Sequence, residues 1–448
     1  MRRHVGRARA GHARSHVPSM NMIVPEPLAR PNARSSGHSR WRLVATIFAS
    51  ATGLTSAYQG VASIALPRSL QQFDPVHKVS LLATTTTLAA ILAIFGMVLG
   101  GMISDRTHSR WGRRTPSIAI GCTVAAILLV MMGSARSAGA LMILMPALWL
   151  ALNFYQAAMT AMLTDRVAPG DLGKVSAAIA LGAPVGTLIG VNITSFVTSA
   201  LGSYMAIAAV LLAGTGILIG FTPESPYLER KVQARPKQGW ALSSFGDRDF
   251  SLAFVSRFLL FIAFYSVTGY LFFLVQDYIG LQRLPGRDAG KAVSVVFSII
   301  TVGWIVVTPI TGFIADRIAK IQWIVGLSSI GIGLSIMVPA LYPTWTAMIV
   351  FSAGVGVSFG IYVAIDLKLM ALVLPDPDAA GRDMALLGVA GGAPQILTPS
   401  IAAAIIGMGG YSSLFLPGAV VGIIGGIASF FIQLKRHRER ADGMASNG

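Results

Sequence analysis

Charged residues and cysteines are both scarce in this chain of 448 residues. Asp, Glu, Lys and Arg make up 12% of the sequence, about half of their share in ordinary soluble domains. The single cysteine, Cys122, lies inside an apolar run, which excludes an intrachain disulfide framework and a multi-cysteine metal site. The sequence contains no HExxH motif, no Walker phosphate loop and no cluster of metal ligands. We therefore expect neither an enzyme nor a bound cofactor, and we exclude ATP as the energy source.

Apolar residues are abundant instead. They make up 54% of the chain, and the mean hydropathy is +0.67. The 48 glycines agree with the higher glycine content of membrane helices. The formal net charge is +17, but the positive residues lie between long apolar runs, so we expect no nucleic-acid partner. The composition is that of a polytopic membrane protein whose surroundings are the lipid bilayer.

Twelve runs are long enough to cross a bilayer, which takes about 20 mostly apolar residues. The predicted spans are 43–66, 79–103, 116–133, 140–164, 175–199, 203–221, 250–275, 290–314, 322–341, 346–373, 384–407 and 411–434. Runs such as 89–101 do not alternate in polarity, as the strands of a membrane β-barrel would. The sequence predicts an all-α membrane protein with twelve transmembrane helices.

The distribution of Lys and Arg predicts the orientation, since these residues concentrate in cytoplasmic loops. With both termini in the cytoplasm, the cytoplasmic segments hold 27 of the 35 Lys and Arg residues, and the opposite face holds six. The remaining two, Arg257 and Lys368, fall inside predicted spans. We expect a multi-pass protein of the cell membrane that acts as a monomer.

The spans divide the chain into five parts. These are a basic cytoplasmic tail (1–42), a six-helix bundle (43–221), a cytoplasmic linker (222–249), a second six-helix bundle (250–434) and a C-terminal tail (435–448). The Arg-rich first forty residues match a disordered tail attracted to anionic lipid and also a transit peptide. A start codon assigned too early, with Met20 or Met22 as the first residue, is the third interpretation.

Three short motifs recur in the two halves at nearly one period. They are Gly101–Arg106 with Gly312–Arg317 (offset 211), Pro169–Lys174 with Pro377–Arg382 (offset 208), and Gly182–Pro184 with Gly392–Pro394 (offset 210). The chain is therefore predicted to be a duplicated six-helix unit. Two parallel repeats of this kind place a substrate site near the midplane, between the halves.

The segment Gly101–Pro116, GMISDRTHSRWGRRTP, resembles the loop motif of the major facilitator superfamily. Its SRWGRRTP part is similar to the form found in sucrose transporters and glycoside–pentoside–hexuronide symporters. The resemblance implies the major facilitator fold with two parallel six-helix repeats. Span 2 lacks the carboxylates that melibiose-type sodium symporters carry there, so sodium coupling at that place is not expected. The segment 182–190 also weakly resembles a Gly/Pro motif of drug antiporters.

The resemblance implies a gate at the cytoplasmic side. Asp105 is expected to lie near the N-terminus of the eleventh span and Asp316 near that of the fifth, where a carboxylate is favourable, so that the contact holds this side shut. The gating candidates are Asp105, Arg106, Arg113, Asp316 and Arg317. Gly101 and Gly312 are expected to let neighbouring helices approach closely. The alternative is that these arginines serve topology alone.

In this fold the resemblance implies that spans 1, 4, 7 and 10 line the cavity, and each carries a polar or aromatic stripe at helical spacing. The substrate-binding candidates are Gln59, Asn153, Gln156, Arg257, Tyr265, Tyr362 and Asp366. Hydrogen bonds between helices, or packing for the aromatic residues, are the alternative explanation for each.

Charges inside a span cost several kcal/mol at the bilayer centre, so they usually mark pathways or pairs. Arg257 and Asp366 lie at nearly equal depth from the cytoplasmic face, and an opposite charge is the simplest compensation. We therefore predict an ion pair between them, with Asp366 as the proton-coupling site. A static structural pair, or separate partners such as Lys368, is the alternative.

The leading functional hypothesis is a secondary active transporter of a small organic solute, coupled to protons, with a sugar or glycoside favoured. Proton-coupled efflux of a drug or secondary metabolite is the first alternative. A membrane receptor or scaffold that transports nothing is the alternative from a different class. The solute, the direction of transport and the coupling ion are left open by the sequence.

Overall fold

The computed structural model describes residues 37–166, 172–224, 241–315, 317–318, 320–375 and 379–434. These residues form helices joined by short loops and contain no β-strand. The all-α fold predicted from the apolar runs is confirmed.

The first half of the chain supplies α1 to α7. They are α1 (Gly37–Gly60), continued by a π-helical turn (Val61–Ala65) and α2 (Leu66–Phe73), then α3 (Lys78–Arg106), α4 (Thr115–Gly133), α5 (Ala138–Arg166), α6 (Leu172–Phe196) and α7 (Ala200–Phe221). The second half begins with a 3-10 helix (Ala241–Gly246). It continues with α8 (Arg248–Thr268), α9 (Leu271–Phe273), α10 (Ala289–Ala315), α11 (Ile321–Leu341), α12 (Trp345–Leu372), α13 (Ala380–Gly409) and α14 (Phe415–Phe430).

Among the described residues, eleven helices are long and apolar enough to cross a membrane. They correspond to the second to twelfth predicted spans. The first predicted span is α1 with its continuation, whose Thr, Ser and Gln residues make it less apolar. Large apolar side chains such as Phe95, Phe196 and Phe313 lie exposed on the outside. Lipid stabilises such a surface and water does not, as expected of a multi-pass membrane protein.

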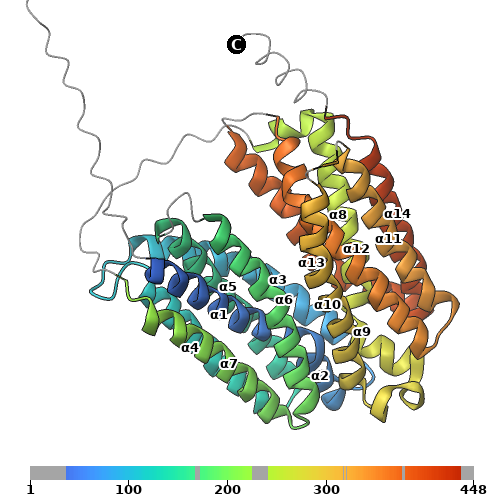
Figure 1. The fold of residues 1–448 in the computed structure, drawn as a ribbon. Coiled ribbons are helices and arrows are strands. Elements are labelled where there is room, and N and C mark those ends of the chain that lie inside the picture. Colours follow the sequence, from blue (N-terminus) through green and yellow to red (C-terminus); the bar gives the residue numbers. More distant parts are fainter. Residues whose placement is uncertain are drawn as a thin grey trace, which may run out of the picture.

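The helices pack in two groups, one from each half of the chain (Figure 1). In the first, α1 packs against α6 and α7, and α5 against α3 and α4; in the second, α8 packs against α13 and α14, and α12 against α10 and α11. The groups meet through α6 with α10 and α3 with α13. They converge near α2, α9 and α10 and diverge towards the ends where α1 begins and α14 stops (Figure 1). We call the converging side the far face and the diverging side the termini face.

Glycines at every fourth position bring α6 close to α1. A Cβ on Gly182 would lie 3.0 Å from the Cβ of Ala51, and one on Gly190 would lie 2.9 Å from the Cα of Ser56. Residues four apart share a helix face, and small residues at this spacing allow close backbone approach between membrane helices. The segment that resembles an antiporter motif therefore has a packing role in this chain.

A similar contact joins α3 to α5, but through a different glycine from the one predicted. A Cβ on Gly100 would lie 2.8 Å from the Cα of Phe154, whereas a Cβ on Gly101 would meet no atom within 4 Å. Gly312 is equally open. The prediction that Gly101 and Gly312 permit close approach is wrong. One step along a helix turns the side-chain direction by about 100°, so Gly101 points away from α5.

The seventh span, predicted as one helix over 250–275, is interrupted. α8 ends at Thr268, the short α9 follows, and Leu274–Gly280 continues as a π-helical turn. The hydroxyl of Tyr270 in this break donates to the carbonyl of Pro399 on α13 at 2.7 Å. The break directs Phe272 and Gln276 into a pocket on the far face.

Candidate functional site

An ion pair joins α8 to α12 inside the second half. Nη1 of Arg257 donates to Oδ2 of Asp366, and the hydroxyl of Tyr362 donates to Oδ1 of the same carboxylate at 2.6 Å. The side chains of Arg257 and Asp366 are each 15% exposed. The predicted contact between Arg257 and Asp366 is therefore present. The roles of these residues in binding and coupling stay predictions.

The pair lies well inside the spans. Arg257 follows the start of α8 by about 13 Å and Asp366 precedes the end of α12 by about 9 Å, at roughly 1.5 Å per residue. The Nε of Arg257 is buried and makes no hydrogen bond with the described residues. The guanidinium therefore keeps a donor beside the carboxylate that no described protein group uses.

Aromatic rings surround the ion pair. The guanidinium of Arg257 lies 5.4 Å from the ring centre of Phe261, close enough for a cation–π contact. The Phe261 ring is stacked with Tyr265 at 5.9 Å and meets Tyr362 edge-on at the same distance. The Tyr265 hydroxyl accepts a hydrogen bond from Nε2 of Gln395 on α13 at 2.8 Å. Tyr265 is thus linked to the pair through Phe261.

The candidates of the first half are neutral. The hydroxyl of Tyr58 donates to Oε1 of Gln156 at 3.1 Å, which joins α1 to α5. The amide of Asn153 donates to the backbone carbonyl of Trp149 in its own helix, and Oε1 of Gln59 accepts from Ser63 one turn away at 3.4 Å. Gln156 is therefore the predicted residue of this half that bonds across helices. Its partner Tyr58 was not predicted.

Arg114 is the centre of a charge cluster on the termini face of the first half. Its side chain is 4% exposed and pairs with Asp105 on α3 at 2.5 Å and with Asp165 on α5 at 2.8 Å. The Glu224 carboxylate accepts the N–H groups of Arg114 and Thr115 at 2.8 and 3.0 Å, which caps the start of α4. The cluster ties together α3, α4, α5 and the end of α7.

Asp105 accordingly has partners other than the predicted one. Its carboxylate pairs with Arg113 at 3.1 Å and with Arg114, both from the loop after α3. Within the described ranges it makes no ion pair or hydrogen bond with α13. The divergence of the two halves at this face accounts for the difference, because the predicted contact requires the halves to meet there.

The remaining gating candidates are Arg106, Arg317 and Asp316. Arg106 is exposed at the end of α3, and the guanidinium of Arg317 lies 5.2 Å from the ring of Phe313. Asp316 lies outside the described residues. Its proposed contact with the N-terminus of the fifth span therefore stays a prediction.

Polar contacts that were not predicted from the sequence join the two halves on the far face. Nζ of Lys78 at the start of α3 pairs with Asp277 at 2.7 Å, and Arg68 on α2 lies 3.7 Å from Asp288 before α10. The hydroxyl of Ser294 on α10 donates to Oδ1 of Asn192 on α6 at 2.9 Å. The sequence did contain a signal for these contacts: oppositely charged residues stand at the outer ends of spans from different halves.

A further polar contact lies deeper on the same side. The hydroxyl oxygens of Thr87 on α3 and Ser400 on α13 are 3.1 Å apart. Together with the ion pairs of the far face, it holds the halves closed on that side while they diverge on the other.

Comparisons with known proteins agree with this architecture. The sequence model of the Major Facilitator Superfamily matches residues 43–375 and, in a second match, residues 292–446. No curated protein gives a significant sequence match. A solved mutant of the nucleoside transporter NupG is similar with a TM-score of 0.67 and 16% identity, covering 87% of this chain and 99% of that one. A bacterial homolog of the human lysosomal transporter Spinster, solved in an inward-facing and unoccupied conformation, is similar with a TM-score of 0.64 and 14% identity, covering 89% and 97%.

At these identities the structural likeness shows the fold alone. The family match carries more, because it covers well over half of the sequence and most of both helix groups. It points to secondary transport across a membrane and away from catalysis. The chain belongs to the Major Facilitator Superfamily.

Proposed function

We propose that this protein moves a small organic solute by alternating access and couples the movement to protons through Asp366. The observation that carries the proposal is the network of Arg257, Tyr362 and Asp366 inside the second helix group. Ionisable residues within membrane spans are expensive, and they mark pathways and proton relays by default. Among the described residues of this site, Asp366 is the carboxylate able to take up a proton.

The geometry suggests how a proton would change the site. The ionised carboxylate holds α8 through Arg257, and Tyr362 supports it from one turn away on α12. A proton on Asp366 removes the charge that Arg257 faces, so the interaction between α8 and α12 weakens. Because the two protonation states favour different helix arrangements, proton binding shifts the conformational equilibrium.

The arrangement of the halves supports one state of such a cycle. The far face is closed by the pairs Lys78–Asp277 and Arg68–Asp288, and the helix groups diverge at the termini face (Figure 1). Passage of a solute from the far side requires these contacts to break. If the termini lie in the cytoplasm, as the charge distribution predicts, this state faces inward.

A sugar or glycoside is the favoured solute class. The loop after α3 resembles that of sugar transporters, aromatic rings line the site, and Gln156 with Tyr58 offers neutral hydrogen-bonding groups. Nucleosides belong in the same panel, because NupG, a structural neighbour, is a nucleoside transporter and a nucleoside carries a sugar. Efflux of a flat drug or metabolite is the alternative that the ring cluster around Phe261 also suits.

Reconstitution into liposomes with an imposed pH gradient tests the proposal. Purified full-length protein should accumulate at least one solute from a panel of sugars, glycosides and nucleosides, and the accumulation should collapse when a protonophore dissipates the gradient. Accumulation against the opposite gradient would favour efflux. Movement of no panel member, and of no hydrophobic dye, in either direction would favour a receptor or scaffold.

The orientation is tested by cysteine labelling in a Cys122→Ser background. Ser137 lies in the loop between α4 and α5 on the far face, and Ser243 precedes α8 on the termini face; both are exposed. A membrane-impermeant maleimide added to intact cells should label Ser137→Cys, and Ser243→Cys only after permeabilisation. The reverse pattern would place the termini outside, and labelling of both from one side would contradict the topology.

A disulfide across the far face should stop transport. The hydroxyl oxygens of Thr87 and Ser400 are 3.1 Å apart, so cysteines at both positions bring two sulfurs near bonding distance (~2.05 Å). In the Cys122→Ser background, oxidation of Thr87→Cys/Ser400→Cys should reduce transport to background, and reduction should restore it. The two single-cysteine variants are the controls. Full transport with the crosslink formed would refute the role of the far face as a gate.

A further inference from the structure

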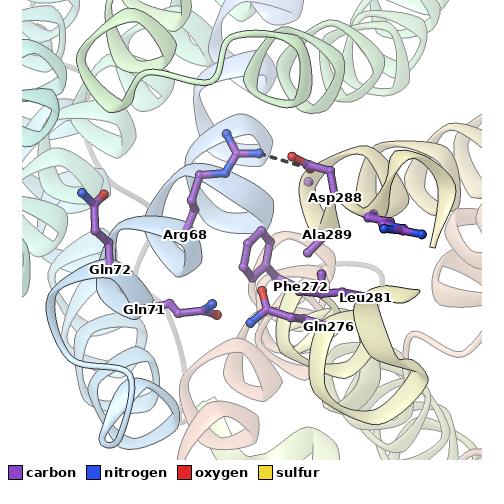
Figure 2. Close-up of a pocket in the computed structure, with 10 residues that line it drawn as sticks. Arg68, Gln71, Gln72, Phe272, Gln276, Leu281, Asp288 and Ala289 are labelled. Atoms are coloured by element: carbon purple, nitrogen blue, oxygen red, sulfur yellow. Dashed lines mark ion pairs between the residues drawn. The ribbon is translucent and has the colours of Figure 1, made fainter. Parts of the chain in front are cut away.

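A pocket of about 330 Å³ opens on the far face between the two halves (Figure 2). This volume is at the lower end of the range for small-molecule sites (~300–1,000 Å³). One wall comes from α2 and the other from the broken seventh span and the start of α10. Its lining includes Arg68, Gln71, Gln72, Phe272, Gln276 and Asp288. The pocket is separate from the Arg257–Asp366 pair, which lies inside the spans on the side nearer the termini face.

The pocket combines an apolar floor with amide groups. The Phe272 ring is 5% exposed and faces the pocket. Figure 2 shows the amides of Gln71 and Gln276, from opposite halves, turned toward each other beside this ring. Gln72 is exposed at the edge. A flat ring beside planar amides suits a small solute that has both a C–H face and hydroxyl groups.

Much of the hydrogen-bonding capacity of these amides is not used by the described protein groups. Oε1 of Gln71 accepts from Lys78 at 3.5 Å, and Nε2 of Gln276 donates to Asp277 at 3.4 Å, both at the long limit. Within the described part of the chain, Nε2 of Gln71, Oε1 of Gln276 and the whole amide of Gln72 make no hydrogen bond with protein. The pocket therefore offers both hydrogen-bond donors and hydrogen-bond acceptors. A hydroxyl group of a ligand can use both, because it donates one hydrogen bond and accepts others.

The charges of the pocket are largely balanced. Arg68 lies 3.7 Å from Asp288 and also donates to the carbonyl of Thr194 at 3.1 Å. Gly290 makes room for this arrangement, because a Cβ there would lie 3.2 Å from Cζ of Arg68. Arg287 adds a positive charge at the exposed edge. The interior therefore favours a neutral solute over an anion.

We propose that this pocket is a second binding site, for a neutral polyhydroxylated solute of about monosaccharide size, and that its occupancy holds the far face closed. A ligand here touches Gln71 from one half and Gln276 from the other, so its contacts are lost when the halves separate on this side. A ligand that binds one conformation better shifts the population toward it. On the proposed transport function, on which this consequence rests, a high solute concentration on the far side slows turnover.

Binding is measured on the purified full-length protein by calorimetry, with D-glucose, D-xylose, sucrose and methyl glucoside as probes and D-glucuronate as the anionic comparison. At least one neutral probe should bind saturably. Gln71→Leu/Gln276→Leu should weaken this binding about tenfold or more. The control Gln433→Leu changes an exposed glutamine on the termini face and should leave the binding unchanged. The oxidised Thr87→Cys/Ser400→Cys protein, closed on the far face, should retain it.

Three results would overturn the proposal: no neutral probe binds, the double leucine variant binds as well as the unmodified protein, or D-glucuronate binds more tightly through Arg287. Comparing sugar binding with transport by the same unmodified protein separates this site from the proposed function. If sugar binding that depends on Gln71 and Gln276 persists while no solute moves in liposomes, the pocket stands and transport fails. If transport proceeds without that binding, transport stands and the pocket fails.

Discussion

Replacing Asp366 by asparagine is expected to reduce proton-driven accumulation of solute to about a tenth of the normal rate or less. A carboxamide keeps the size and much of the hydrogen bonding of the carboxylate, but it cannot bind and release a proton at neutral pH. The hydroxyl of Tyr362 can still donate to the remaining oxygen, at the position it now occupies 2.6 Å from Oδ1. Accumulation in liposomes with an imposed pH gradient is the measurement, compared with exchange at equal solute on both sides.

The substitution also leaves the charge of Arg257 without its partner, and removing one member of a buried pair costs about 3–5 kcal/mol. Loss of folding is therefore controlled by the double variant Arg257→Gln/Asp366→Asn, which removes both charges. The double variant should recover thermal stability and still lack proton-driven accumulation. Normal accumulation by a folded Asp366→Asn protein would remove the coupling role from Asp366, even though the pair exists.

Alanine at Gly100 should lower stability, whereas alanine at Gly101 should leave it unchanged or raise it. A Cβ at Gly100 would meet the backbone of Phe154, with 2.8 Å to its Cα, so α3 and α5 must move apart. Overpacking of this kind costs about 1–3 kcal/mol, and more where backbone has to shift. At Gly101 a Cβ meets nothing within 4 Å, and alanine in an open helical position gains up to ~1 kcal/mol over glycine.

The measurement is the thermal unfolding midpoint of each purified variant in the same detergent, with transport as a second readout. Gly100→Ala should unfold at a lower temperature than the unmodified protein, and Gly101→Ala at an equal or higher one. Equal destabilisation by both substitutions would mean that the register of α3 against α5 is wrong. Gly312→Ala, which is also open, should behave like Gly101→Ala.

The class of fold was predictable because the bilayer imposes a simple rule on sequence. Each span needs about 20 apolar residues, and eleven helices of the described residues meet that requirement. Details within the spans were harder to predict from the sequence. The break after Thr268 and the choice of Gly100 over Gly101 depend on which neighbour a residue faces, and a one-residue shift reverses the answer.

The candidate site was likewise predictable only in part. The contact between Arg257 and Asp366 was predictable because few charged residues lie inside spans. Two opposite charges at the same depth lower each other's cost when they pair. Tyr58, which bonds Gln156, was missed because one hydroxyl on a membrane helix is indistinguishable by sequence from many others. The far-face pairs were missed because Lys78 and Asp277 are 199 positions apart, and nothing local links them.

In the proposed function, solute movement carries a proton through Asp366. Liposomes that contain the full-length protein and a pH-sensitive dye, with equal pH on both sides, test it directly when a gradient of the transported solute is applied. We expect the solute gradient to change the internal pH with the unmodified protein. With Asp366→Asn the internal pH should stay constant while solute exchange continues. An equal pH change with a folded Asp366→Asn protein would rule out proton coupling through Asp366.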